Sequence, residues 1–525
     1  MWKETLDNQT GTDSRFTKYS VLTFLFICGL LLFNHEMWRD ELQAWLIAKD
    51  SSSILNLFQN LKYEGHPYLW YIGLYVFSRF SDQPFAMQLF HLIIATSVIY
   101  LFVKYAPFTR VQKILFMFGY FPLYEYGVIS RNYSLGFLLI FAFCAVFQQS
   151  RNRNNLLVLS GILFLLSQVS AYALIISIIL GLMLVFDALI DTEVRKSLSK
   201  RKWIVFTAIS IFIFGIIISV LQQLLPPDSS SNAAGGWRLA IDFKEMGRAF
   251  TIIWKAYVPI PKFRFHFWGS NIIRNHLLQF VLSSLFFCYF LLLFVRKPAI
   301  FFLYTVGTLG IVAVSYAKFY GYIRQHGHLF ILLVACLWLS AYYPDKKIRL
   351  KFIDSLSSVC SKYKDKVIIL VFATQLIAGI YAGGVDLLYP FSGGKATAQF
   401  IKDKQMQDML LIGDDESAIT VAGYLNKKIY YIRGGRVGSF VTWDKKRVAV
   451  WEKKQKLDRQ EVISIAKDQM RRHKKNVLLI LNYQPAVPAS VTEKSEYHLV
   501  MIKEFTGNIE PDEQFYLYTL KHDQL

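Results

Sequence analysis

The sequence is poor in charged residues and cysteines for a chain of 525 residues. Charged side chains make up 18% of it, while 54% of the residues are hydrophobic and 16% aromatic. A soluble globular protein usually carries more charge and less apolar sequence. The composition therefore excludes an ordinary soluble enzyme and predicts a membrane protein with many helical spans.

The five cysteines form neither a metal-binding nor a disulfide pattern. They lie far apart, without a CxxC spacing, and none follows Cys360. A metal cluster or a disulfide framework would need paired or closely spaced cysteines. Internal repeats and heptad arrays are also missing, and Gly413-Asp414-Asp415 is too short a match for a nucleotide-binding fingerprint.

Eleven apolar runs divide the chain, most of them near the ~20 residues that a membrane span needs. The Lys and Arg residues of five loops share one side if the 14-residue segment Pro67 to Phe80 does not cross. The positive-inside rule makes that side cytoplasmic. The net charge of +21 therefore indicates topology and gives no reason to expect nucleic acid as a partner. The predicted spans are 19–33, 84–103, 112–127, 133–149, 155–170, 171–189, 203–222, 272–295, 299–316, 327–343 and 366–384.

This topology makes the N-terminus cytoplasmic and the loops 34–83 and 223–271 external. Residues 1–384 are then a transmembrane catalytic part, and residues 385–525 a soluble extracytoplasmic domain whose short apolar runs and helical patterns suggest a βαβ unit. The predicted fold class is a polytopic α-helical membrane protein with about eleven transmembrane helices and a small C-terminal α/β domain. A bacterial inner membrane is the expected location.

Acidic residues gather in the first outer loop, directly after the first span. Asp40 and Glu41 follow Arg39, and Glu64 and His66 come about two dozen residues later. An ionisable group at the edge of a bilayer costs free energy unless it is wet, paired or used. We expect Asp40 to be a general base that Glu41 orients or tunes. Neutralisation of nearby arginines, or solvation beside the headgroups, is the simpler alternative.

The same loop shows helical spacing that predicts two short helices on the membrane plane, with Ser51 to Ser53 as caps, followed by an interfacial helix. Glu64 and His66 could complete a divalent metal site with Asp40, although this ligand set has no fixed spacing. The alternative for His66 is a turn residue that hydrogen-bonds locally. Asp40 and His66 are thus the metal candidates.

Two outer turns carry cations on the side that lacks basic loops. Snorkelling side chains and interfacial tyrosines would explain such residues without any ligand. Cations at this boundary nevertheless favour a bound anion, for which a lipid phosphate is the natural choice. The residues are Arg131 and Tyr133 in one turn, and Lys318, Tyr320, Arg324, His326 and His328 in the turn KFYGYIRQHGH.

These residues resemble the GT-C superfamily of membrane glycosyltransferases, which includes protein O-mannosyltransferases and the lipid A aminoarabinose transferase. The chain departs from the pattern at Tyr68, where better-known relatives have a second proline. The motifs that carry the resemblance are Arg39-Asp40-Glu41, Gly65-His66-Pro67, Ser130-Arg131-Asn132-Tyr133 and the turn from Tyr320 to Gly327.

The resemblance implies transfer of a sugar from a polyprenyl-phosphate donor to a glycan, lipid or protein acceptor on the extracytoplasmic face, usually with inversion. Asp40 would be the base and Glu41 its neighbour, while Arg324 and His326 would hold the donor phosphate. The residues expected to bind substrate are Arg39, Glu64, His66, Arg131, Tyr133, Lys318, Tyr320, Arg324 and His326.

Two other functions are compatible with the sequence. A lipid-linked glycan flippase or transporter would have polar residues at mid-depth in its spans. Few ionisable residues interrupt the apolar runs here, which favours the enzyme. A non-catalytic membrane scaffold is the third possibility, and in a scaffold Asp40 would be replaceable.

Overall fold

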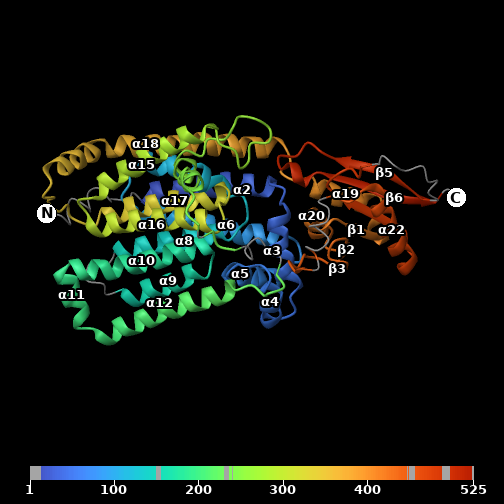
Figure 1. Cartoon of the computed structure of the whole chain (residues 1–525), viewed down its shortest axis with the longest axis horizontal. Coiled ribbons are helices and arrows are strands. Elements are labelled where there is room, and N and C mark those ends of the chain that lie inside the picture. Colours follow the sequence, from blue (N-terminus) through green and yellow to red (C-terminus); the bar gives the residue numbers. More distant parts are fainter. Residues whose placement is uncertain are drawn as a thin grey trace.

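The computed structural model describes residues 14–148, 155–229, 236–238, 240–445, 447, 456–486 and 497–522. Its helices form an elongated bundle, and a small α/β part covers one end of that bundle (Figure 1). The basic residues Arg151 and Arg153, which the sequence assigns to a cytoplasmic loop, lie outside the described residues.

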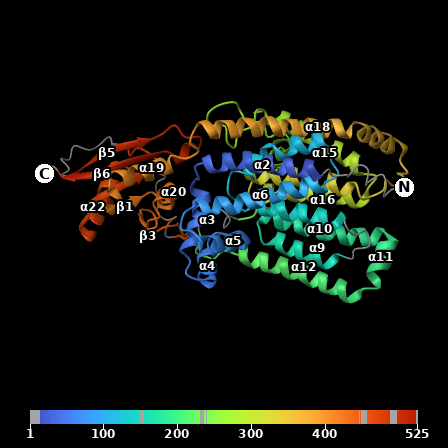
Figure 2. The same ribbon diagram turned by 180° about the vertical axis from the view of Figure 1, so that it is seen from behind.

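Eight helices in the described part of the chain are long and apolar enough to cross a membrane. They run roughly along the long axis of the molecule (Figures 1 and 2). The chain is therefore an integral, multi-pass membrane protein. The eight helices are α2 (Ser14–Asn34), α6 (Phe85–Tyr105), α10 (Ala171–Ile190), α12 (Lys202–Gln223), α15 (His276–Phe294), α16 (Pro298–Ala317), α17 (Ile323–Ser340) and α18 (Lys351–Leu388).

The other three predicted spans correspond to shorter helices. Segment 112–127 is divided into α7 (Arg110–Met117) and a π-helical turn, η1 (Tyr120–Glu125). The other two are α8 (Tyr133–Gln148) and α9 (Leu156–Ser167). The total of eleven spans therefore remains a prediction. A short helix, α11 (Thr192–Ser199), connects α10 to α12.

The last span is longer than the sequence pattern suggests. Residues 366–384 form the C-terminal half of α18, a helix of 38 residues. The basic residues Lys362 and Lys364, which precede the predicted span, and Lys366, its first residue, therefore lie on one helix. Neither Gly nor Pro occurs from Lys351 to Ala378, so no residue in this stretch ends the helix before the apolar sequence begins.

The first outer loop folds into α3 (Arg39–Asp50), α4 (Ile54–Leu61) and α5 (Leu69–Ser78). Ser53 caps α4 as predicted, because its side chain accepts a hydrogen bond from the Asn56 amide at 3.1 Å. The predicted position of α3 on the membrane plane stays a prediction, but protein and not lipid covers this helix. Every residue from Glu41 to Ala48 is buried, since α5 packs on one side of α3 and α20 of the C-terminal part on another.

The C-terminal part contains a six-stranded sheet of order β3-β2-β1-β4-β6-β5. Its β1, α20 and β2 form the predicted βαβ unit, with β1 parallel to both β2 and β4. The remaining pairs are antiparallel. The elements are α19 (Gly394–Asp403), η3 (Met406–Asp408), β1 (Leu410–Gly413), α20 (Asp415–Leu425), β2 (Ile429–Tyr431), β3 (Arg436–Gly438), α22 (Arg459–His473), β4 (Val477–Leu481), β5 (Tyr497–Phe505), η4 (Pro511–Glu513) and β6 (Phe515–His522).

All residues of the helix α17 except Arg324 are buried, and Arg324 lies in the first turn of this helix. The long outer loop supplies α13 (Phe243–Phe250) and α14 (Ile252–Tyr257), and α14 packs against α17. The first outer loop, the long outer loop and the last outer turn therefore meet at the same end of the bundle.

Candidate active site

Asp40 lies in the first turn of α3 and pairs with two arginines from distant parts of the chain. Its Oδ2 atom is 2.5 Å from Arg131 Nη1 and 3.3 Å from Arg324 Nη2. The Asp40 side chain is 30% exposed, and each arginine side chain is 14% exposed. The structure thus brings together the acid and two of the cations that the sequence analysis singled out, at a place that solvent reaches.

The arginines determine the ionisation of Asp40. Partial burial raises the pKa of a carboxyl group, but the positive charges of Arg131, Arg324 and Arg39 outweigh it and lower the pKa of Asp40 to about 2. The carboxylate is therefore ionised at neutral pH. A carboxylate with so low a pKa is a weak base for as long as both guanidinium groups remain beside it.

Aromatic rings surround the guanidinium of Arg324. Its central carbon lies 5.2 Å from the ring centre of Trp38, 5.4 Å from that of Trp268 and 4.9 Å from that of Tyr322. Trp268 is held by its indole N–H, which donates to Glu125 Oε2 at 3.1 Å. These contacts fix the cation in place without neutralising its charge. Neither Trp38 nor Trp268 belongs to the site residues predicted from the sequence.

Glu41 is fully buried beside Asp40 and faces the protein interior. Its Oε1 accepts a hydrogen bond from the Ser130 amide at 2.6 Å, and its Oε2 accepts one from the Trp38 amide at 3.2 Å. His35 Nε2 lies 3.1 Å from the same Oε2 atom. These contacts favour the orienting role that the sequence suggested for Glu41.

Glu64 and His66 lie close to Asp40 and have strongly shifted pKa values. Burial raises the pKa of Glu64 to about 7, although Gln43 Nε2 donates to its Oε1 at 2.9 Å. Burial, with the charge of Arg131, lowers the pKa of His66 to about 4, so its imidazole is neutral at pH 7. A neutral imidazole beside cations can accept a proton or a hydrogen bond from a substrate.

The described residues offer little support for a metal ion. No group of three or more His, Cys, Asp or Glu side chains among them could hold one. Asp40, one of the two metal candidates, is engaged by Arg131 and Arg324. The positive charge of Arg131 also acts on His66, the other candidate. A divalent cation would have to compete with both guanidinium groups for the Asp40 carboxylate.

Two of the expected substrate-binding residues contact protein groups around the site. Tyr133 lies 5.9 Å from the Arg131 guanidinium, measured to its ring centre, and its hydroxyl accepts a hydrogen bond from Gln325 at 3.0 Å. Arg39 turns toward the C-terminal part, where Nη2 is 3.7 Å from Asp512 Oδ2. Their part in substrate binding stays a prediction.

The two histidines of the last outer turn are buried in α17. His326 Nε2 is 2.9 Å from the carbonyl of Tyr320, and because a carbonyl only accepts, Nε2 carries the proton. His328 Nδ1 pairs in the same way with the Gln325 carbonyl, and its ring stacks on Tyr172. The histidines thus stabilise the turn that holds Arg324, while anion binding by His326 stays a prediction.

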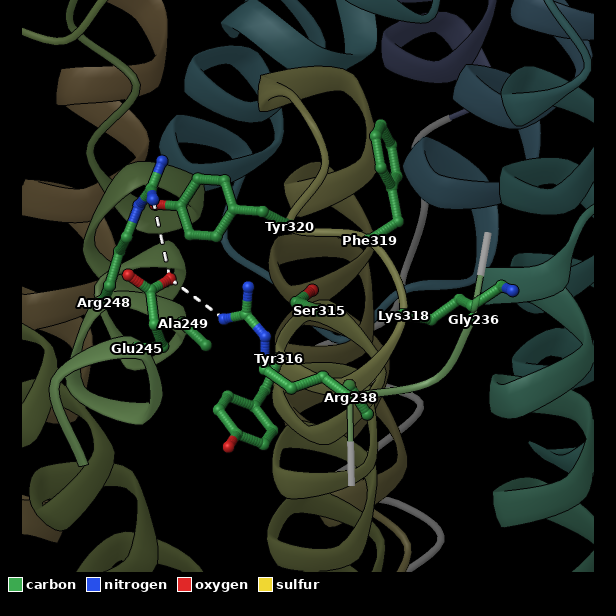
Figure 3. A pocket seen from close by; sticks show the side chains of 11 residues that line it. Gly236, Arg238, Glu245, Arg248, Ala249, Ser315, Tyr316, Lys318, Phe319 and Tyr320 are labelled. Atoms are coloured by element: carbon green, nitrogen blue, oxygen red, sulfur yellow. Dashed lines mark ion pairs between the residues drawn. The ribbon is translucent and has the colours of Figure 1, made fainter. Parts of the chain in front are cut away.

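A cavity of about 220 Å³ lies beside the same turn, between α13 and the end of α16. Figure 3 shows Arg238 and Arg248 on either side of Glu245, at 3.3 and 3.5 Å from its Oε2. The predicted residues Lys318 and Tyr320 also line the cavity. Three cations against one carboxylate make it a basic cavity. Arg238 and Arg248 were not singled out from the sequence because they lie in a long loop without a motif.

The fold is similar to that of ArnT from Cupriavidus metallidurans. The structure of that protein bound to undecaprenyl phosphate shares 11% sequence identity, covers 96% of this chain and 97% of its own, and has a TM-score of 0.50. The apo state gives 11% identity, coverage of 96% and 98%, and a TM-score of 0.49. No protein-family model and no curated protein matches the chain. At this identity the likeness shows the fold alone, so the glycosyltransferase activity that the resemblance implies stays a proposal.

Proposed function

We propose that the protein is an inverting glycosyltransferase that moves a sugar from a polyprenyl-phosphate donor to an acceptor on the extracytoplasmic face. The observation that carries the proposal is the Asp40 carboxylate, partly exposed and paired with Arg131 and Arg324. A base for the acceptor and cations for a departing phosphate then belong to one site. The fold shared with ArnT, which has been seen bound to undecaprenyl phosphate, supports a donor of this kind.

In the proposed reaction, an acceptor hydroxyl or amine attacks the anomeric carbon of the sugar. The bond from this carbon to the phosphate oxygen breaks, the new bond forms on the opposite face, and the acceptor proton passes to Asp40. The polyprenyl phosphate leaves with the electron pair and gains negative charge. Arg131 and Arg324 stabilise that charge because they are held in place before the reaction begins.

Donor binding would also make Asp40 a better base. Without donor, Arg131 and Arg324, together with Arg39, hold the pKa of Asp40 at about 2. A donor phosphate that contacts both arginines shares their positive charge and brings its own negative charge near Asp40. Both effects raise the pKa of the carboxyl group toward a value suited to accepting a proton.

We infer that the donor headgroup reaches this site by way of the basic cavity. It begins beside α13, whose Phe243 side chain is 82% exposed and whose Met246 is 44% exposed, as expected of a helix that lies against lipid. Its lining includes Tyr320, four residues before Arg324 in the same turn. A polyprenyl tail could thus remain in the bilayer while its phosphate passes between cations.

The proposal includes eleven spans, a cytoplasmic N-terminus and an extracytoplasmic α/β domain formed by residues 385–525. The position of the first outer loop and the sheet at one end of the bundle supports this topology (Figure 1). A bacterial inner membrane, where polyprenyl-phosphate sugars serve the synthesis of envelope glycans, is the proposed location. The acceptor is a glycan, a lipid or a protein.

The direct test is sugar transfer from a set of radiolabelled polyprenyl-phosphate sugars in membranes that contain the wild type, Asp40→Asn, Arg324→Ala or Asp82→Asn. Asp82 is an exposed carboxylate of the same outer loop and serves as the control. We expect one donor to be used by the wild type and by Asp82→Asn, and by neither site variant. Equal behaviour of all four membranes with every donor would contradict the proposal.

A further inference from the structure

A buried ionic cluster lies directly behind Asp40. His35 Nδ1 is 2.7 Å from Asp386 Oδ2, and His35 Nε2 is 3.1 Å from Glu41 Oε2. None of the three residues is more than 3% exposed. The cluster joins the end of α2, the start of α3 and the end of α18. The first two elements are neighbours in the sequence, whereas α18 lies about 300 residues further along the chain.

The imidazole of His35 is protonated in this arrangement. Each ring nitrogen faces a carboxylate oxygen, which accepts a hydrogen bond when it is ionised, so both nitrogens donate. Burial alone lowers the pKa of His35, but the charges of Asp386 and Glu41 outweigh burial and raise it to about 10. One cation therefore links two carboxylates that lie 345 positions apart in the chain (386 − 41).

The cluster reaches the Asp40 site through the other oxygen of Glu41, which accepts the hydrogen bond of the Ser130 amide at 2.6 Å. Ser130 precedes Arg131, and Glu41 follows Asp40. The hydrogen bond between Glu41 and Ser130 and the ion pair between Asp40 and Arg131 therefore lie side by side, and both join the start of α3 to the segment before α8. Whatever holds Glu41 on Ser130 also sets Arg131 against Asp40.

We propose that His35 and Asp386 are positioning residues for the reaction. The imidazolium, anchored on α18 by Asp386, orients Glu41 so that Glu41 fixes the segment of Ser130 beside Asp40. This inference rests on the proposed sugar transfer, and it brings into the reaction two residues that do not contact Asp40. It also connects the site to α18, the helix that leads into the C-terminal part.

The test compares His35→Gln and Asp386→Asn with His498→Gln, which alters an exposed histidine of β5. We expect kcat for sugar transfer to fall about 10- to 100-fold in the two cluster variants, because a base misplaced by about 1 Å costs that much. The KM for the polyprenyl-phosphate sugar should change less than kcat, because Arg324, the other arginine beside Asp40, keeps its aromatic contacts. Asp386→Asn keeps the shape and one acceptor oxygen, so it tests the inference even if His35→Gln folds poorly.

A double-mutant cycle tests whether His35 acts through Arg131. If it does, His35→Gln combined with Arg131→Lys should lose no more than about threefold in kcat beyond Arg131→Lys alone. Fully additive losses would overturn the inference, because they would mean that the two residues act independently.

Hydrogen exchange of the peptide that contains Ser130 gives a readout that does not depend on activity. His35→Gln should speed hydrogen exchange of this peptide selectively, because Glu41, which accepts the hydrogen bond of the Ser130 amide, is no longer held in place. Unchanged exchange there would overturn the positioning role. If the wild type transfers no sugar while the peptide still loses protection, the proposed function fails and the link from His35 to Ser130 is established separately.

Discussion

Replacing Asp40 by Asn should make the protein bind undecaprenyl phosphate more tightly while it abolishes sugar transfer. In the donor-free protein Asp40 neutralises the guanidinium groups that the phosphate is proposed to contact. The charges of Arg131, Arg324 and Arg39 together lower its pKa from 3.8 to about 2 in spite of burial, which corresponds to about 2.4 kcal/mol. Because the side chain is 30% exposed, solvent screening reduces the usable part to about 1–2 kcal/mol.

An incoming phosphate must overcome this interaction in the wild type but not in Asp40→Asn. The difference predicts about 5- to 30-fold tighter binding by the variant, since 1.4 kcal/mol corresponds to a factor of ten. Tryptophan fluorescence can report the binding, because Trp38 and Trp268 flank Arg324. Asp82→Asn removes a charge from the same loop and should leave the affinity unchanged. Unchanged or weaker binding by folded Asp40→Asn would refute phosphate binding at the two arginines.

Three further outcomes are expected. Burial raises the pKa of Glu64 from 4.5 to about 7, so its ionisation costs stability increasingly as the pH rises from about 4.5 through 7. In thermal unfolding, Glu64→Gln should match the wild-type Tm at about pH 4 and exceed it by about 1–3 °C at about pH 8. Equal Tm values at the higher pH would contradict this. Arg324→Lys should weaken undecaprenyl phosphate binding at least about tenfold, because an ammonium group lacks the planar stacking and the forked donors of a guanidinium. If the Arg324→Lys variant bound with the affinity of the wild type, a specific role for Arg324 would be excluded. The side chain of Gln43 makes hydrogen bonds to both backbone groups of Val441, at 2.7 and 3.0 Å. Gln43→Ala should therefore lower the free energy of unfolding by about 1–3 kcal/mol and speed proteolysis of the loop around Val441. Unchanged proteolysis would show that this contact does not hold the C-terminal part.

The sequence alone was sufficient for the membrane class, most of the helices and the βαβ unit. These features follow from composition and from local periodicity, which a chain expresses whatever it later packs against. It also indicated Asp40, Arg131 and Arg324, because charged residues beside apolar runs are costly and therefore informative. The helix α3 shows the limit of such reasoning, since a short amphipathic helix looks the same whether lipid or α20 covers it.

Only the tertiary structure determined how these residues combine. Arg131 and Arg324 come from different outer turns, and their meeting on one oxygen of Asp40 depends on how α17 and the segment before α8 pack. The contact of His35 with Asp386 spans 351 positions, and no local pattern marks either residue as its partner. Distances between such residues are set by helix packing over the whole bundle, whereas the choice of residue types at the membrane edge is set by local solvation. The sequence therefore determined which groups the site could use, and the packing decided which of them act together.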